Sequence, residues 1–150
     1  MNVPDEAALS ALAAFQPGAG RSVVFKTDRF TVIDGSYNCN PTSMEAALDV
    51  LKSADGRRVC IFGDMLELGP DAPAYHARIG AHAKACGIER MITVGTLAKN
   101  AAYDERDAFD TVDALLDALP RLLRDGDTIL VKASLGMHLK RVVDAIKDMK

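Results

Sequence analysis

Apolar and polar positions alternate along most of this chain in two distinct rhythms. Nearly continuous apolar runs, typical of strands buried on both faces, occur at Arg58–Phe62, Met91–Val94 and Thr128–Lys132. Apolar residues spaced three and four positions apart predict helices at Pro41–Lys52, Pro73–Cys86, Val112–Leu123 and Met137–Met149. Pro120 should kink or restart the third of these helices. Repeated alternation of strand and helix is typical of a mostly parallel sheet.

The first part of the chain departs from this rhythm. Pro4–Phe15 predicts a short helix, and Pro17–Gly20 is typical of a linker. Ser22–Lys26 and Phe30–Asp34 predict two strands with a tight connection, which resembles a hairpin. Ala108–Asp110 is a weak candidate for a further edge strand. We therefore predict an α/β fold of three-layer, Rossmann-like type. Its mostly parallel sheet should carry helices on both faces and an antiparallel N-terminal edge strand.

Composition narrows the class of protein. The chain has 150 residues, about one domain, and a net charge of −3 with its basic residues spread out. This distribution argues against a nucleic-acid or anionic-membrane surface. No apolar run is long enough for a membrane span, and the start lacks the features of a signal peptide. The three cysteines are odd in number and far apart, which favours a reducing, cytoplasmic setting.

Several motifs that would define a function are missing from the sequence. There is no G-x-x-x-x-G-K-[ST] phosphate-binding loop. Gly18-Ala19-Gly20 starts like a dinucleotide fingerprint, but a strand follows it where a helix is required. His76 and His82 are six positions apart, on different faces of one helix, so they do not predict a metal pair. We therefore expect no catalytic residue and no metal ligand in this chain.

In parallel sheets, ligands bind outside the carboxyl ends of the strands, which directs attention to three loops. The first loop follows Asp34 and carries Tyr37, Asn38 and Asn40 before Pro41 starts a helix. Amide, phenol and carboxylate groups beside a helix N-terminus suit a nucleotide or a polar peptide. Turn chemistry with a plain Asn-Pro helix cap explains the same residues, and the pattern does not decide between the two.

The other two loops follow the most apolar strands. Asp64 and Glu67 come after the strand that ends at Phe62, where they could contact a metal, a ribose or an amine, or belong to a solvated loop. Lys132 ends a strand, and Ser134 is placed to cap the next helix, which suits a carboxylate or a phosphate. A lysine that extends to solvent beside a routine cap is the alternative.

Three segments occur together in an order that resembles one family. IDGSYNCNPTSMEAALDVL is similar to an IDDSYNANP-x-S-M-x-x-A-L segment, and CIFGDMLELG with His76 and Gly80 is similar to a GDMLELG…H…G segment. ILVKASLGMHLKRVV is similar to VLVKGSRGMRMEKVV. These are segments of the bacterial Mur ligases, in the branch that adds D-alanyl-D-alanine to a UDP-linked muramoyl tripeptide. The resemblance covers nearly the whole chain.

The resemblance implies a part of a larger enzyme. Residues 1–21 resemble the tail of a central ATPase domain with its linker, and residues 22–150 resemble the C-terminal domain of the ligase. In the family, ATP phosphorylates the tripeptide carboxylate and the incoming amine attacks the acyl phosphate, while Mg²⁺ offsets phosphate charge. ATP and Mg²⁺ would be held mainly by the central domain. The expected partners are UDP-N-acetylmuramoyl-tripeptide, D-alanyl-D-alanine and the N-terminal and central domains, and this part alone should be inactive.

Site residues follow from the resemblance by position. Those implied to bind nucleotide are Arg21, Asp34, Tyr37 and Asn40. Those implied to bind substrate are Tyr37, Asn38, Asn40, Asp64, Lys132 and Ser134.

Four positions depart from the family pattern. Gly35 stands where a second aspartate is usual, which weakens a ribose contact unless Asp34 replaces it. Ala133 replaces a glycine, and Leu135 and His138 replace arginines, so carboxylate recognition loses positive charge. Two alternatives stay open: another amide ligase of the same superfamily, of the folylpolyglutamate or muramoyl-peptide type, and a stand-alone, non-catalytic nucleotide-binding module.

Overall fold

The computed structural model describes residues 23–36 and 39–149. The predicted helix Pro4–Phe15 and linker Pro17–Gly20 lie outside the described residues. So do the predicted domain boundary at residues 21 and 22 and the site candidates Arg21, Tyr37 and Asn38.

The described strands form one sheet in the order β1-β2-β6-β3-β4-β5. Strand β1 pairs antiparallel with β2, and all other neighbours are parallel. The bounds are β1 Val23–Lys26, β2 Thr31–Gly35, β3 Arg58–Gly63, β4 Arg90–Val94, β5 Ala108–Phe109 and β6 Thr128–Lys132. The predicted α/β fold with an antiparallel edge strand is therefore confirmed.

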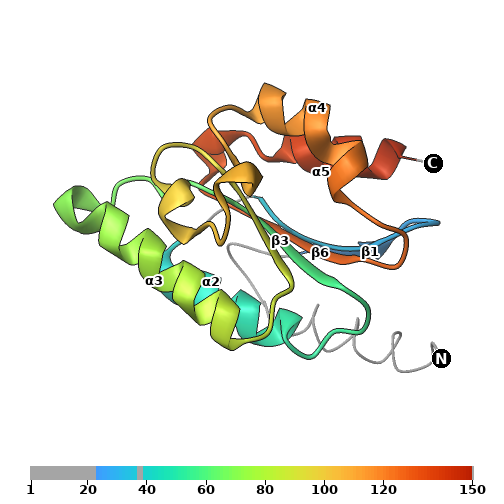
Figure 1. The fold of residues 1–150 in the computed structure, drawn as a ribbon, viewed down its shortest axis with the longest axis horizontal. Helices are drawn as coiled ribbons and strands as arrows, with labels where there is room; N and C mark the ends of the chain where they lie inside the picture. Colours follow the sequence, from blue (N-terminus) through green and yellow to red (C-terminus); the bar gives the residue numbers. More distant parts are fainter. Residues whose placement is uncertain (1–22, 37–38, 150) are drawn as a thin grey trace.

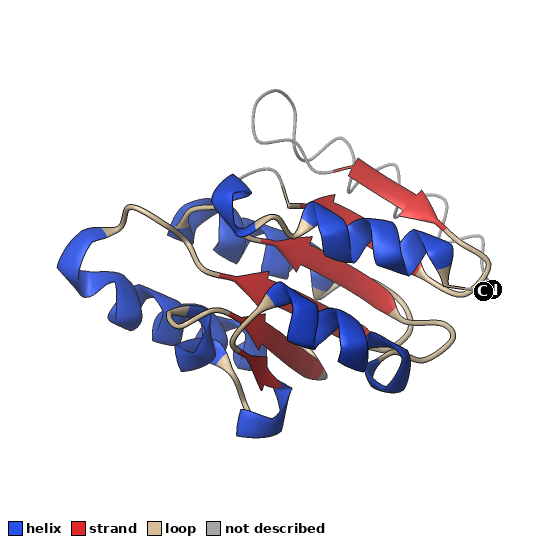
Figure 2. Ribbon diagram, turned by 90° about the horizontal axis from the view of Figure 1, so that it is seen from above, coloured by secondary structure: helices blue, strands red, loops and turns tan. Residues whose placement is uncertain are grey.

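Helices cover both faces of this sheet, as Figures 1 and 2 show. The α-helices are α2 Pro41–Leu51, α3 Ala72–Ala85, α4 Val112–Leu122 and α5 Lys140–Asp148. Short 3₁₀ turns are η1 Gly69–Asp71, η2 Ala98–Ala101, η3 Glu105–Asp107 and η4 Leu135–Met137. No helix within residues 23–36 and 39–149 is long and apolar enough to cross a bilayer.

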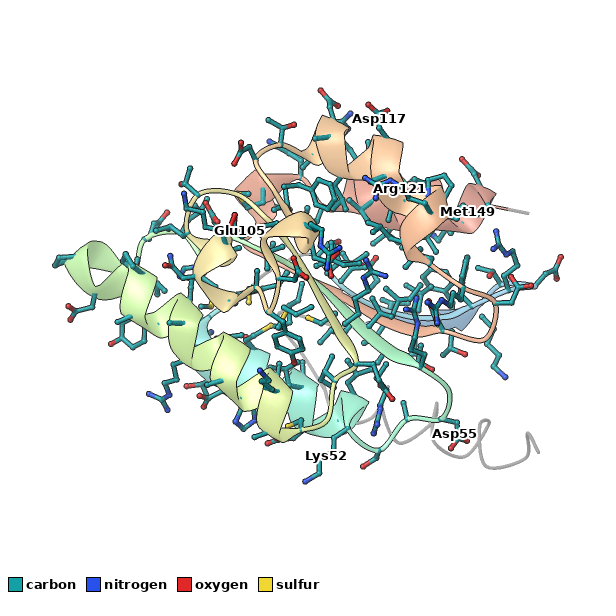
Figure 3. The ribbon with its side chains drawn as sticks, in the orientation of Figure 1. Lys52, Asp55, Glu105, Asp117, Arg121 and Met149 are labelled. Atoms are coloured by element: carbon teal, nitrogen blue, oxygen red, sulfur yellow. The ribbon has the colours of Figure 1, made fainter. Side chains whose placement is uncertain are left out.

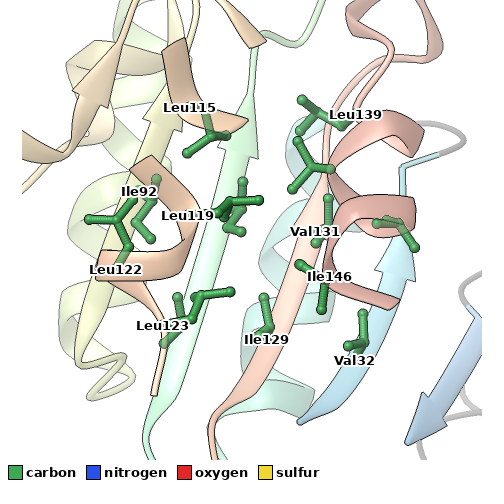
Figure 4. Packing of buried hydrophobic residues seen from close by; sticks show 14 of the residues in the cluster. Val32, Ile92, Leu115, Leu119, Leu122, Leu123, Ile129, Val131, Leu139 and Ile146 are labelled. Carbon is green, nitrogen blue, oxygen red and sulfur yellow. The ribbon is translucent and has the colours of Figure 1, made fainter. Parts of the chain in front are cut away.

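Side chains of the central strands alternate between two cores. Ile129 and Val131 of β6 face the cluster under α4 and α5, whereas Leu130 faces the cluster under α2 and α3. Figure 4 shows the first cluster, where Leu115 and Leu119 of α4 and Ile146 of α5 pack over these strands. Burying one such side chain contributes about 1.5–3 kcal/mol. The prediction that these strands are buried on both faces is confirmed.

A restart at Pro120 and a helix start at Met137 are the two details of the predicted helices that are wrong, whereas a kink at Pro120 stays a prediction. Helix α4 continues through Pro120 to Leu122 without a restart, because the proline lies in the last turn and removes only one hydrogen bond. The closing helix starts at Lys140 and not at Met137, since η4 precedes it and His138 adopts a left-handed backbone with φ 59°. Histidine tolerates this conformation better than most residues.

Candidate functional site

The loops at the carboxyl ends of β2, β3, β4 and β6 form one polar edge of the sheet. Hydrogen bonds join the loops after β3 and β6, because the Ser134 N–H donates to the Asp64 carbonyl at 3.1 Å. The Leu66 N–H donates to Ser134 Oγ at 2.8 Å. The predicted side-chain cap by Ser134 is therefore wrong, since its hydroxyl serves the β3 loop and makes no cap bond.

Asp64 links the β3 loop to the loop after β4. Its Oδ1 accepts from the N–H groups of Leu97 at 3.0 Å and Ala98 at 2.7 Å, at the start of η2. A Cβ added at Gly95, which has φ +112°, would lie 2.4 Å from that same oxygen, so this close approach requires glycine. Asp64 is buried. Its observed contacts organise two loops, and contact with a substrate stays a prediction.

A buried histidine fixes the start of the β3 loop from below. His76 of α3 accepts from the Met65 N–H at 2.8 Å through Nε2, and its Nδ1 lies 2.6 Å from the Ala72 carbonyl. Both contacts are satisfied by the neutral ring with its proton on Nδ1. The ring also packs against Phe62, with centroids 5.5 Å apart. The sequence had drawn attention to His76 as a possible metal ligand and as part of the family resemblance, and neither indicated this anchoring role.

Lys132 is a buried cationic residue at this edge. The residue is 1% exposed, and desolvation lowers the pKa of its ammonium group. The alternative of a lysine that extends to solvent is therefore wrong. A Cβ at Gly35, on the neighbouring strand, would lie 3.2 Å from Lys132 Cγ. The glycine that departs from the family pattern thus leaves room for the stem of the lysine.

Asp34 is engaged within its own loop. Its Oδ1 accepts from the Ser36 N–H at 3.0 Å and from the Ser36 hydroxyl at 2.6 Å. Its Oδ2 lies 3.5 Å from Nζ of Lys140, at the start of α5. These contacts hold the end of β2 against α5. Whether Asp34 reaches a ribose, as its replacement role would need, stays a prediction.

Asn40 starts α2 as predicted. Its Oδ1 accepts from the Ser43 N–H at 2.8 Å, and Ser43 Oγ accepts from the Asn40 N–H at 3.0 Å, which together make a capping box. Pro41 takes the first helical position, where its missing N–H has no cost. Asn40 is exposed, so its amide group faces solvent at the polar edge while its oxygen stabilises the helix.

A groove of about 790 Å³ opens beside Asn40. The first turns of α2 form one wall, and Glu67, Leu68, Tyr75 and Arg78 form the other. Glu67 has a left-handed backbone with φ 65°, which costs a non-glycine residue about 1–2 kcal/mol. Strain of this kind is concentrated at functional sites. The sequence had indicated Glu67 as a candidate ligand contact. Tyr75 and Arg78 were not predicted to line a site, because they lie in the following helix and not in a strand-end loop.

Two large apolar side chains are exposed at the same edge. Leu66 is 39% exposed and Leu135 is 56% exposed. They come from loops that touch, since a Cβ at Gly136 would lie 3.0 Å from Leu66 Cδ1. The family resemblance implies arginine at the position of Leu135, and with leucine there this part of the edge is apolar.

Comparison with known proteins gives this geometry a family. Residues 20–135 match the family described as Mur ligase, glutamate ligase domain. The chain is 39% identical over 121 residues to UDP-N-acetylmuramoyl-tripeptide--D-alanyl-D-alanine ligase of Escherichia coli (strain K12), covering 78% of this chain and 27% of that protein. The chain thus spans about a quarter to a third of the length of the curated relatives it matches.

Solved structures agree with this match. A crystal structure of MurF from Acinetobacter baumannii has a TM-score of 0.78 at 28% identity, over 89% of this chain and 31% of that one. MurF ligase from Thermotoga maritima, in complex with ADP, has a TM-score of 0.74 at 19% identity, over 88% of this chain and 31% of that one, and supports the fold alone. The chain therefore belongs to the Mur ligase family and corresponds to its C-terminal glutamate ligase domain.

Proposed function

We propose that this chain acts as the C-terminal part of an ATP-dependent ligase that adds D-alanyl-D-alanine to UDP-N-acetylmuramoyl-tripeptide in peptidoglycan precursor synthesis. The observation that supports this most is the polar edge, where a groove lies directly beside the N-terminus of α2. Four strand ends supply its loops, which is where ligands bind in sheets of this kind. The relatives named for this reaction match 78% and 93% of this chain.

ATP and Mg²⁺ would be held mainly by the central domain of the ligase. The 150 residues contain no phosphate-binding loop. At the polar edge, the carboxylates of Asp34 and Asp64 are engaged by Ser36 and by backbone N–H groups, so they do not make an open set of magnesium ligands. This domain would instead close the nucleotide site from one side, with Arg21, Asp34, Tyr37 and Asn40 toward the nucleotide.

The incoming amine would enter the groove. Asn40 is exposed for direct contact, and Glu67 offers a carboxylate at the rim to a cationic amine. Asp64 and Ser134 would act on the substrate by fixing the loops, and Lys132 would lie buried behind them. Tyr37 and Asn38 are proposed as substrate contacts from the family resemblance. Closure onto the central domain would exclude water, which matters because an acyl phosphate hydrolyses.

The proposed substrates and the free cysteines favour a cytoplasmic location for the enzyme. ATP and UDP-linked precursors are cytoplasmic compounds, and all three cysteines are free thiols within the fold. The partners would be the N-terminal and central domains of the ligase, together with its two substrates.

The test is an assay of the full-length ligase that contains this chain, carrying Asn40→Ala, with D-alanyl-D-alanine and glutamate as competing amines. We expect D-alanyl-D-alanine to be incorporated and kcat/KM for it to fall about tenfold or more in the variant, since a substrate hydrogen bond is lost. The matched control is Thr111→Ala, which removes the cap of α4, where Thr111 Oγ1 accepts from the Ala114 N–H. Both variants should lose about 1 kcal/mol of stability.

Three outcomes contradict the proposal. Incorporation of glutamate in place of D-alanyl-D-alanine would assign the chain to another ligase of the superfamily. Equal kcat/KM in the two cap variants would remove Asn40 from the substrate site. The isolated chain should not hydrolyse ATP. Detectable ATP hydrolysis by it would contradict the proposal that the central domain holds ATP and Mg²⁺.

A further inference from the structure

Helices α2 and α3 carry a second cluster of reactive side chains, outside the polar edge. Both helices follow a strand and run back along the same face of the sheet, so they lie side by side and parallel (Figure 1). Glu45 pairs with Arg78 at 2.9 Å, and one turn further on Asp49 pairs with His82 at 2.7 Å. Cys86 ends α3 after another turn, and its Sγ lies 3.5 Å from the same oxygen of Asp49.

These last three residues bring three different ligand atoms together. One carboxylate oxygen of Asp49, Nε2 of His82 and Sγ of Cys86 all lie within 4.8 Å of one another. In a tetrahedral zinc site the ligand atoms lie about 2.0–2.3 Å from the metal, and hence about 3.3–3.8 Å from each other. Only small side-chain rotations separate the observed cluster from that geometry.

We propose that Asp49, His82 and Cys86 form a binding site for a divalent transition-metal ion of the zinc type. Imidazole, thiolate and carboxylate are the donors that zinc takes in proteins, whereas Mg²⁺ and Ca²⁺ require oxygen ligands throughout. Three protein ligands leave a fourth position for water. On binding, the Cys86 thiol releases its proton to solvent, and the Sγ–metal bond forms in its place.

The spacing along the helix supports the same assignment. His82 and Cys86 are four positions apart, so their side chains project from the same face of one helix. Asp49 approaches from the neighbouring helix, which makes the site a clip between two elements. The sequence predicted no metal ligand, because neither the spacing of its histidines and cysteines nor the acidic loop of Asp64 and Glu67 indicates a cluster that spans two helices.

The cluster is open to an ion from one side. The side chains of Asp49 and His82 are 60% and 31% exposed, and Cys86 closes the site from the protein interior. The charged group that acts on both Asp49 and Cys86 from nearby is Lys52, which lies at the outer end of the helix pair in Figure 3. Arg58 also lies nearby, where its guanidinium donates to the Lys52 carbonyl at 2.7 Å and pairs with Glu89. Asp49 carries one negative charge, and the Cys86 thiolate adds a second when the thiol loses its proton, which favours a divalent ion.

The proposed metal site lies away from the groove that we assign to the ligase substrates. Both helices begin at the carboxyl edge of the sheet, where the groove lies, and end at the opposite edge. Asp49, Cys86 and His82 belong to the last turns of the two helices. The bound ion would therefore fasten α2 to α3 behind the groove, as a structural clip without contact to the reacting groups.

The experiment titrates the 150-residue chain, first freed of metal with a chelator, with Zn²⁺ by calorimetry. Co²⁺ serves as a second probe, because a cobalt–thiolate bond produces a charge-transfer band in the near ultraviolet. We expect one ion per chain, the cobalt band, and a higher Tm with Zn²⁺. Cys86→Ala should abolish the band, and His82→Ala and Asp49→Asn should each weaken binding about 100-fold or more, since even the loss of outer-shell partners costs about 10–100-fold.

Matched controls separate a site from general thiol or imidazole binding. Cys39→Ala removes another buried thiol, and His138→Asn removes another histidine at a left-handed position that asparagine tolerates. Both should bind Zn²⁺ as the unmodified chain does. Circular dichroism of each variant checks that it folds. Absence of stoichiometric binding in the unmodified chain, or a cobalt band that survives Cys86→Ala, overturns the proposal and leaves a plain ion pair between two helices.

Discussion

The two edges of the sheet close in opposite ways. At the amino edge, charged side chains pair with each other: Arg57 and Asp127 precede neighbouring parallel strands and make two hydrogen bonds at 2.9 Å. Asp127 is 1% exposed and also accepts from the Arg124 N–H at 2.8 Å. Arg58 and Glu89 form a second pair at the starts of β3 and β4, at 3.0 Å. The charged side chains named at the amino edge are thus paired with each other.

At the carboxyl edge, polar side chains bond mainly to loop backbone. Asp64, Ser134 and His76 each hold N–H groups of a loop in place. This arrangement shapes the loops and leaves the groove, the exposed Asn40 and the strained Glu67 free for a ligand. At the amino edge buried and half-buried charges pair with each other, whereas at the carboxyl edge Asp34 and Lys140 form a longer contact of 3.5 Å and most polar side chains hold loop backbone beside an open groove.

The largest effect should come from the amino edge. Asp127→Leu leaves Arg57 without its partner and should cost about 3–5 kcal/mol of the free energy of unfolding, measured by urea denaturation. The double variant Arg57→Met with Asp127→Leu should lose less, because no uncompensated charge remains. Ligase activity per folded molecule should be unchanged. An equal loss of unfolding free energy in the single and double variants would show that the Arg57–Asp127 pair does not stabilise this edge.

Substitution of Asp64 should have a smaller effect on stability and should also slow ligation. Asp64→Ala leaves two backbone N–H groups unsatisfied and should cost about 2 kcal/mol. Asp64→Asn keeps an acceptor oxygen at the same place and should lose less than half of that. Measured side by side by thermal unfolding and by ligation rate, the alanine variant should be the slower enzyme. If asparagine proves as damaging as alanine, loop anchoring is not the role of this residue.

The smallest effect should appear with pH at Cys39. Burial raises the pKa of its thiol from the ordinary value of 9.0 to about 12. Below pH 9.0 the thiol is neutral in both states and its contribution to stability is complete; as pH rises toward 12, the unfolded thiol ionises and that contribution is lost. Stability should therefore fall more steeply than in Cys39→Ala, by up to about 1.4 kcal/mol per pH unit. Parallel curves from neutral pH to about pH 10.5 would contradict this.

Particular residues show how far the sequence predicts this fold. The bounds of β6 were predicted correctly, because its apolar run begins beside Asp127 and ends at a glycine-containing loop. The order of the strands did not follow from the sequence, since burial patterns of parallel strands are alike and the neighbours are chosen by packing. The His138 backbone and the late start of α5 depend on one left-handed residue, which periodicity does not reveal.

The sequence predicted where the candidate site lies, but not the hydrogen bonds that its residues make. Asp34, Asn40, Asp64 and Lys132 do lie at one edge, as the rule for parallel strands requires. The partners of Asp64 are 33 and 34 residues away, and no local pattern indicates them. What each residue binds stays a prediction that the ligation assays must decide.

The central place of β6 has a consequence for synthesis on the ribosome. Strands β2 and β3 are made early, yet they do not touch each other; each pairs with β6, whose residues are 128–132. Until that segment emerges, the nascent chain carries two unpaired hydrogen-bonding edges, which are prone to association with other chains. A product that stops before residue 128 therefore lacks the strand that makes one sheet out of two halves, and we expect it to depend on chaperones and to be cleared by proteases.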